Sequence, residues 1–264
     1  APRLKAVIRY GIGVDTLDLE AATDCGVMAV NFPDFCIREV ANHALVLLLA
    51  CAKKITRLDN RLRTSGWASA REVLSPMGAI HGETLGLIAF GNIARALARS
   101  ALAMEMRVIA HDPYVPPEVM AEHGVEAVSL EELAARSDYV SCHLPLSAKT
   151  RGLLDAHFFA QMKPSAYFIN TSRGAVVKES DLLAALQQGQ IAGAGLDVFE
   201  REPIPPDHPL CRLENVILTP HSASWADATF EALHRRVSEA ALTIARGGTP
   251  HFVANPEVLP HRRQ

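Results

Sequence analysis

The chain has 264 residues, of which 49% are apolar and 21% are charged, and its formal net charge at pH 7 is −3. This length is sufficient for one large domain or two ordinary ones, and the small charge gives no electrostatic basis for binding nucleic acid or an anionic membrane. The 5 cysteines are scattered and never spaced C-x-x-C, which argues against a disulfide framework or a metal site and favours a reducing cytoplasm. The longest apolar stretch, residues 44–52, is too short to span a bilayer, and no signal peptide opens the chain.

The first 80 residues contain two strand-like segments and then a long helical stretch. The strand-like segments are LKAVIRY (4–10) and VMAVNFP (27–33), and the helical pattern runs from Glu39 to about Leu62. Residues 39–55 of this stretch are apolar around most of the helix circumference, so they must be buried on several sides. The burial can occur within one domain or against a second copy of the chain.

From Thr84 onward, apolar runs alternate with helical patterns. The expected strands are residues 84–90, 106–112, 139–145, 165–170, 191–198 and 215–220, and residues 225–246 form a final amphipathic helix. Apolar strands separated by helices predict a doubly wound α/β domain around a parallel sheet. Because Pro and Gly cluster at 75–82, we expect three parts: 1–75 with a linking helix, a nucleotide-binding domain at 76–220, and a return helix with its tail at 221–264.

Residues 85–99, LGLIAFGNIARALAR, approach the dinucleotide-binding fingerprint G-x-G-x-x-G. Gly91 occupies the middle position, where a small residue lets the pyrophosphate approach backbone N–H groups at a helix N-terminus. Ala94 is tolerated at the third position, whereas Ala89 replaces the glycine of the first turn and fits there if its φ is negative. Asp112 lies about twenty residues further on, where a carboxylate binds the ribose hydroxyls and repels a 2′-phosphate, which favours NAD over NADP. The alternative is an incidental turn of small residues beside a surface aspartate.

Three further segments place polar side chains at the ends of successive predicted strands. They are NTSRGAVV (170–177) with Arg173, LDVFEREP (196–203) with Asp197 and Glu202, and LTPHSAS (218–224) with His221. Singly, each residue has an ordinary structural explanation as a surface cation, a loop carboxylate or a packed histidine. Together, beside a nucleotide-binding loop, the arginine, glutamate and histidine predict a catalytic site.

These segments, with RYGIGVDTLD (9–18) and CHLPLSAKTRGLL (142–154), resemble the D-isomer-specific 2-hydroxyacid dehydrogenase family over essentially the whole chain. Within it, the chain looks most like phosphoglycerate dehydrogenases and relatives of C-terminal-binding protein. The resemblance implies an NAD-binding Rossmann domain and a smaller flavodoxin-like substrate domain that is N-terminally incomplete here. It also implies a homodimer, because the region around 39–55 belongs to the dimerising part of the nucleotide domain in this family.

The resemblance implies a role for each matching residue. Arg173 would bind the substrate carboxylate or keto oxygen, and His221 would donate and accept the proton while paired with Glu202. The residues expected around the NAD are Phe90, Gly91, Asn92, Ile93, Asp112, His143, Leu144, Pro145, Thr150, Thr171, Ser172, Arg173, Asp197, His221, Ala223 and Ser224. Those expected around the substrate are Arg9, Tyr10, Gly11, Ile12, Gly13 and Trp225, although Trp225 can equally serve as packing at the start of a helix.

These residues and the resemblance together predict an NAD-dependent enzyme that interconverts a small 2-keto acid and its D-2-hydroxy acid. A histidine paired with a carboxylate can supply the proton that the alkoxide needs, and an arginine can hold an α-keto acid bidentately. Two alternatives remain open at this point. One is an NAD-sensing, corepressor-like dimer, which can carry the same three residues; the other is an inactive nucleotide-binding remnant.

Overall fold

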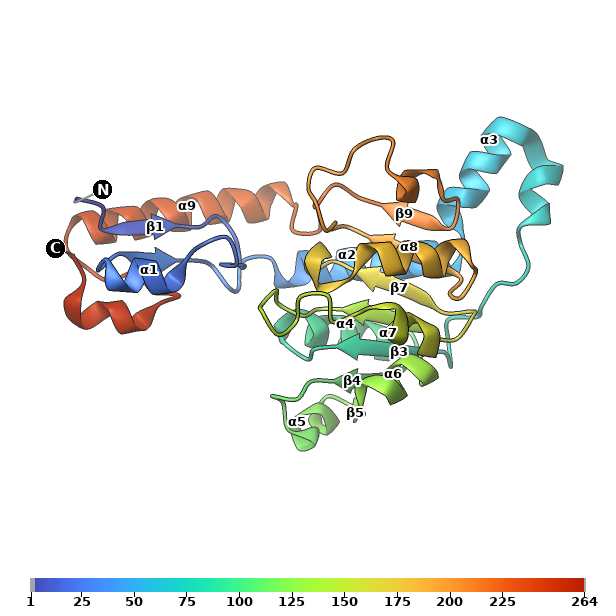
Figure 1. Cartoon of the computed structure of the whole chain (residues 1–264), viewed down its shortest axis with the longest axis horizontal. Coiled ribbons are helices and arrows are strands. Elements are labelled where there is room, and N and C mark those ends of the chain that lie inside the picture. The colour runs from blue at the N-terminus through green and yellow to red at the C-terminus, as the bar shows by residue number, and fades with distance from the viewer. Residues whose placement is uncertain (1–2, 264) are drawn as a thin grey trace. The chain divides into compact units, whose positions relative to one another are not determined.

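The computed structural model describes residues 3–263, and the chain divides into two compact units (Figure 1). The larger unit comprises residues 38–224, and the smaller one combines the residues up to Ile37 with those from Trp225 onward. This division differs from the predicted boundary at 75–82. Side chains of residues 41–52 belong to the same apolar core as the nucleotide-binding strands, whereas residues 225–246 share a core with the first 37 residues.

The larger unit is built on one parallel sheet of seven strands in the order β5-β4-β3-β6-β7-β8-β9. The strands are β3 (Thr84–Ile88), β4 (Arg107–His111), β5 (Glu126–Ala127), β6 (Tyr139–Cys142), β7 (Tyr167–Asn170), β8 (Gly193–Leu196) and β9 (Val216–Leu218). All six strands predicted from Thr84 onward are confirmed. The edge strand β5 was not predicted, because two residues carry no periodic pattern.

Helices cover both faces of this sheet. They are α2 (Ile37–Ala52), α4 (Asn92–Ala103), α5 (Pro117–Glu122), α6 (Leu130–Arg136), α7 (Ala156–Gln161) and α8 (Glu179–Gln187). Helix α3 (Ile55–Glu72) extends beyond the sheet (Figure 1), and two short 3₁₀ turns, η1 (Gly174–Val176) and η2 (Pro209–Arg212), complete the unit. One core contains buried side chains of α2, α4 and α5, such as Leu47, Leu97 and Met120. The other contains side chains of α6, α7 and α8, such as Leu133, Phe158 and Leu182. The predicted doubly wound α/β fold is therefore confirmed.

The single helix predicted from Glu39 to about Leu62 is wrong, because the chain forms two helices there. Lys54 adopts φ 52° between α2 and α3, in the left-handed region that ends a helix. Its ammonium group donates a hydrogen bond to the Val73 carbonyl (2.9 Å), which ties this break to the residue that follows α3. The break carries neither Gly nor Pro, so the sequence gives no signal for it. Within α3, Gly66 adopts φ 80° and ψ −178°, which kinks that helix.

The smaller unit contains a parallel pair of strands, β1 (Ala6–Ile8) and β2 (Met28–Val30), connected through α1 (Leu19–Asp24). The long helix α9 (Asp227–Ala245) lies alongside β1 (Figure 1), and the 3₁₀ segment η3 (Pro256–His261) follows it. Met28, Leu233 and Val258 are among the side chains of its core. The buried Asn255 accepts a hydrogen bond from the Ala29 N–H (2.7 Å) and donates one to the Val27 carbonyl (3.1 Å), so the C-terminal segment is held against β2. Both strands and the final helix predicted for these segments are confirmed.

The turn after β3 places Ala89 at φ 72°. Its N–H donates to the His111 carbonyl (2.8 Å), and the next N–H, of Phe90, donates to Oδ2 of Asp112 (2.9 Å). The expectation that alanine fits through a negative φ is therefore wrong. Two hydrogen bonds to the end of β4 hold the turn in a conformation that glycine adopts without strain.

We expect Ala89→Gly to raise the free energy of unfolding by about 0.5–1 kcal/mol, because the left-handed penalty of about 1–2 kcal/mol exceeds the entropic cost of glycine. The matched control is Ala94→Gly in α4, which removes a fully buried methyl group from a helix and should lower that free energy by about 1 kcal/mol or more. Urea denaturation of both variants measures the difference. Equal losses in the two variants would show that the turn stores no strain.

Candidate active site

The end residues of six strands form one continuous row across the sheet. Ile88 of β3 pairs with His111 and Cys142, Cys142 pairs with Asn170, Asn170 with Leu196, and Leu196 with Leu218. Each predicted segment therefore leaves its strand at the same level of the same edge. The strand order reverses between β3 and β6, which is the place where open α/β sheets bind ligands.

The fingerprint loop ends at the N-terminus of α4. Gly91 is the N-cap of this helix and offers no side-chain cap to its first N–H groups. A Cβ atom added to Gly91 would have no other atom within 4 Å, so the space in front of the loop is open. Asn92 and Ile93 begin the helix, and the buried Phe90 anchors the turn. Uncapped N–H groups beside open space suit the pyrophosphate of a dinucleotide.

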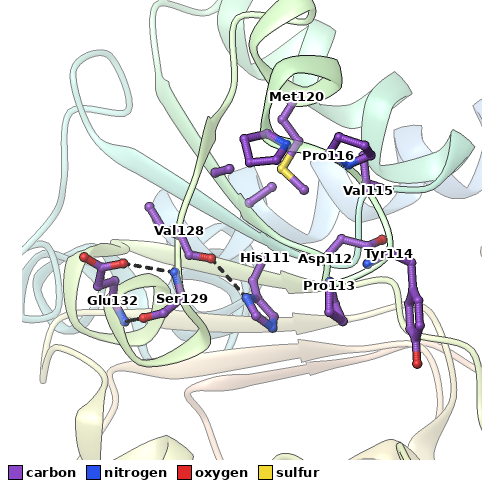
Figure 2. Close-up of a pocket in the computed structure, with 13 residues that line it drawn as sticks. His111, Asp112, Pro113, Tyr114, Val115, Pro116, Met120, Val128, Ser129 and Glu132 are labelled. Atoms are coloured by element: carbon purple, nitrogen blue, oxygen red, sulfur yellow. Dashed lines mark hydrogen bonds between the residues drawn. The ribbon is translucent and has the colours of Figure 1, made fainter.

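Asp112 follows β4 and is held by two backbone groups. Its Oδ2 accepts the Phe90 N–H and its Oδ1 accepts the Tyr114 N–H, both at 2.9 Å. The carboxylate borders a cleft of about 540 Å³ between the end of β4, α5 and the start of α6 (Figure 2). Neither lysine nor arginine is among its described lining residues, whereas Asp112 and Glu132 are. The described lining of the cleft thus carries negative charge.

His111 was not predicted as a site residue, although its ring also lines this cleft. Its Nδ1 lies 3.0 Å from the Val128 carbonyl, and Figure 2 shows the ring beside Asp112 and Pro113. The only available sequence signal is its place immediately before Asp112.

The segment after β6 contains His143, Leu144, Pro145 and Thr150. The His143 N–H donates to the Ile88 carbonyl (2.9 Å), which ties this segment to the fingerprint strand. Burial lowers the pKa of the His143 imidazole to about 4, so the ring is neutral near neutral pH. The Thr150 hydroxyl donates to the Pro145 carbonyl (2.6 Å) and closes the loop.

A buried amide shapes the Arg173 loop. Oδ1 of Asn170 accepts hydrogen bonds from the Ser172 N–H (3.0 Å) and hydroxyl (2.8 Å), and its Nδ2 donates to the Arg173 carbonyl (3.1 Å). The Arg173 guanidinium donates to the Ser172 carbonyl (2.8 Å). Oγ1 of Thr171 is buried and has no hydrogen-bond partner among the described residues. A buried hydroxyl without a protein partner at this edge of the sheet is consistent with a hydrogen bond to a bound ligand.

His221 and Glu202 form a close pair. Nδ1 of the histidine lies 2.7 Å from Oε2 of the glutamate, and the other carboxylate oxygen accepts the Phe199 N–H (3.0 Å). Both side chains are exposed. Because Nδ1 is engaged, Nε2 is the ring nitrogen left for proton exchange with a substrate. His221 itself adopts φ 52°, a strained backbone conformation for a residue with a side chain.

Asp197 is completely buried behind His221. Its oxygens accept hydrogen bonds from the Thr219 hydroxyl (2.6 Å) and from the N–H groups of Ser222 (2.8 Å) and Ala223 (2.9 Å). His43 of α2 adds a contact of 3.0 Å from Nε2 to the Thr219 hydroxyl, and this histidine was not predicted as a site residue.

The expected NAD residues and the three catalytic candidates all belong to the larger unit, and the residues expected around the substrate lie in the smaller one. There, the Gly11 carbonyl accepts the Phe32 N–H (3.0 Å), and Arg9 donates to the Tyr10 carbonyl (2.9 Å). The Asn31 amide donates to the Ile12 carbonyl (2.7 Å). Trp225 is 66% exposed, while its ring centroid lies 4.5 Å from that of Phe230. Packing at the start of α9 is therefore one of its roles.

Within residues 3–263, no group of His, Cys, Asp and Glu side chains is arranged to hold a metal ion. No helix in that range is both long and apolar enough to cross a membrane.

Comparisons with known proteins identify the family of the chain. Residues 45–223 match the model of the D-isomer specific 2-hydroxyacid dehydrogenase NAD-binding domain. A glyoxylate reductase of Korarchaeum cryptofilum is 40% identical over 263 residues, covering 99% of this chain and 79% of that protein. A D-3-phosphoglycerate dehydrogenase of Methanocaldococcus jannaschii is 38% identical over 264 residues, and the chain spans 50% of its length.

Solved structures give the same result. An NADPH-dependent glyoxylate/hydroxypyruvate reductase of Sinorhizobium meliloti, in complex with NADP and malonate, is 33% identical with a TM-score of 0.88, covering 100% of this chain and 81% of that one. The holo form of a Rhodotorula graminis D-mandelate dehydrogenase is 32% identical with a TM-score of 0.88. The match covers 96% of this chain and 76% of that one.

The named relatives are reductases and dehydrogenases, so the comparisons do not favour the corepressor-like alternative. The residues at the strand ends fit a nicotinamide dinucleotide, as the uncapped helix N-terminus, the open space at Gly91 and the orphaned Thr171 hydroxyl indicate. The chain belongs to the D-isomer-specific 2-hydroxyacid dehydrogenase family and is an NAD-dependent oxidoreductase of that family.

Proposed function

We propose that this enzyme reduces a small 2-keto acid to the D-2-hydroxy acid, with His221 as the proton donor, Glu202 as its partner and Arg173 as the substrate-binding cation. The observation that carries the proposal is the 2.7 Å contact between Nδ1 of His221 and Oε2 of Glu202. This pair follows two adjacent strands of the sheet that also carries the dinucleotide-binding loop.

The nicotinamide, when bound, supplies the hydride for the keto carbon. The oxygen of that carbonyl then needs a proton, and Nε2 of a protonated His221 delivers it. Glu202 stabilises the imidazolium through Nδ1 and fixes the orientation of the ring. In the oxidative direction the same nitrogen accepts the proton of the hydroxy acid.

Arg173 suits the carboxylate and carbonyl oxygens of a 2-keto acid, because a guanidinium donates two parallel hydrogen bonds. Its loop is held by the buried Asn170, which limits the movement of its backbone. The turn at residues 9–13 and Trp225 are proposed to contact the rest of the substrate. The relatives named glyoxylate reductase support a small 2-keto acid as the class of substrate.

The first test concerns the proton donor. In Glu202→Gln the neutral amide stabilises the imidazolium less and holds the ring less firmly, so we expect kcat for reduction to fall roughly tenfold while NADH affinity stays unchanged. His221→Ala should reduce turnover about a hundredfold or more at every pH. Arg173→Ala should impair both substrate binding and turnover. Steady-state rates of NADH oxidation with a panel of 2-keto acids between pH 5 and 10 measure all three.

A kcat that stays at the wild-type value in Glu202→Gln would contradict the pairing. Near-normal reduction by His221→Ala would contradict the proposed function itself. A fluorescence titration with NADH separates these effects from a loss of cofactor binding.

The second test concerns the cofactor. We expect tighter binding of NADH than of NADPH, because the described lining of the Asp112 cleft provides two carboxylates and neither lysine nor arginine for a 2′-phosphate. Fluorescence titrations with the two cofactors compare the dissociation constants. Asp112→Ser should narrow the difference, whereas equal or tighter NADPH binding by the wild-type protein would overturn the preference.

We also propose that the enzyme is a homodimer through α2 and α3. Val46 is 59% exposed, Ile55 55%, and Trp67 69%, although these side chains are large and apolar. Helix α3 extends beyond the sheet of its own unit (Figure 1). Burial against a second copy would remove this apolar area from water.

Sedimentation velocity at micromolar concentration should give the mass of a dimer for the wild-type protein and that of a monomer for Trp67→Glu. Leu242→Glu is the matched control, since Leu242 is 55% exposed on α9 and should leave the mass unchanged. A monomeric wild-type protein would overturn the homodimer.

A further inference from the structure

The polar network behind His221 includes a histidine that the proposed mechanism does not use. His43 lies on α2, where the buried residues near it in the sequence are apolar: Ala41, Ala44 and Leu47. Its Nε2 lies 3.0 Å from Oγ1 of Thr219 and 3.6 Å from Oδ1 of Asp197. The contact joins residues 176 positions apart, and all three residues belong to the larger unit.

The direction of the hydrogen bonds follows from the available protons. The Thr219 hydroxyl has one proton, which it donates to Oδ1 of Asp197 at 2.6 Å. Oγ1 therefore accepts from His43, and Nε2 of His43 carries a hydrogen. The result is a directed chain from the His43 ring through the Thr219 hydroxyl to the buried carboxylate.

The same carboxylate holds the backbone around His221. Oδ1 accepts the Ser222 N–H and Oδ2 accepts the Ala223 N–H, while the Asp197 carbonyl accepts the His221 N–H (2.8 Å). A residue at φ 52° persists only where its surroundings impose that conformation. Asp197 is completely buried, so it needs these hydrogen bonds to remain in place.

We propose that His43 is a positioning residue of the proton-transfer pair, acting through Thr219 and Asp197 on the backbone of residues 221–223. This inference rests on the proposed function, in which His221 transfers the proton. If the N–H donor at Nε2 of His43 is removed, the Thr219 hydroxyl is free to rotate away from Asp197. The carboxylate then loses its shortest hydrogen bond, and the His221 ring shifts relative to the reacting atoms.

A histidine that only filled space on α2 would be replaced without cost by an apolar residue of similar size. The test therefore compares His43→Leu, which removes the donor, with His43→Gln, whose amide places an N–H at a similar distance along the side chain. We expect His43→Leu to lower kcat for 2-keto acid reduction roughly tenfold with an unchanged NADH dissociation constant, as a small misplacement of a reacting group does. His43→Gln should recover most of this loss. The exposed His157→Leu on α7 is the control and should leave kcat unchanged.

A double-mutant cycle with Thr219→Val tests the route. Because His43 acts through the Thr219 hydroxyl, the double variant His43→Leu/Thr219→Val should be no slower than the slower single variant. Multiplied losses in the double variant would overturn the route through Thr219. An unchanged kcat in His43→Leu would overturn the positioning role. The role would also be overturned if His43→Gln had the thermal stability of the wild-type protein and yet did not recover kcat.

Activity of the wild-type enzyme separates this inference from the proposed function. Absence of 2-keto acid reduction by the wild-type protein contradicts the proposed function. The His221 ring resonances of the free protein then test the positioning by NMR: they should shift in His43→Leu and return in His43→Gln. Resonances unchanged in His43→Leu would overturn the inference without reference to any substrate.

Discussion

The site depends on the register of one parallel sheet. Six strands end in a single paired row, from His111 through Ile88, Cys142, Asn170 and Leu196 to Leu218, so the loops that follow them all begin at the same edge. A slip of one residue in any strand would turn its side chains to the opposite face and move its loop out of this group. The glycine-containing turn, Asp112, Arg173 and His221 follow strand ends at one edge of the sheet because the strands share one register.

The loops themselves are held by hydrogen bonds to polar side chains. Asp112 accepts the Phe90 N–H of the fingerprint turn and the Tyr114 N–H of its own loop, Asn170 accepts the Ser172 N–H, and Asp197 accepts those of Ser222 and Ala223. Asn170 and Asp197 are buried, and a buried amide or carboxylate without such bonds would be strongly destabilising, so these two side chains stabilise one loop conformation. This rigidity maintains the left-handed backbone at Ala89 and His221, where each turn brings a functional group to the sheet edge.

Much of the fold could be predicted because its signals are local. Near-continuous apolar strands alternate with helical periods from Thr84 onward, which restricts the chain to a parallel, doubly wound sheet. Prediction failed where no local signal exists. Lys54 breaks a helix in a segment without Gly or Pro, β5 has two residues, and the division into units depends on which core buries α2 and α9. The candidate site followed from motifs at strand ends, whereas His43 and His111 lie outside those motifs.

By itself, the sequence determined the fold class, the dinucleotide-binding loop with its acidic partner, and the family to which the chain belongs. These properties depend on residue types at fixed short spacings, which are readable along the chain. Only the tertiary structure decided the positive φ of Ala89 and His221, the pairing distance of Glu202 and His221, and the contact of His43 with Thr219 across 176 positions. Such features arise from hydrogen bonds between segments that meet only after folding, and their partners leave no periodic pattern in the sequence.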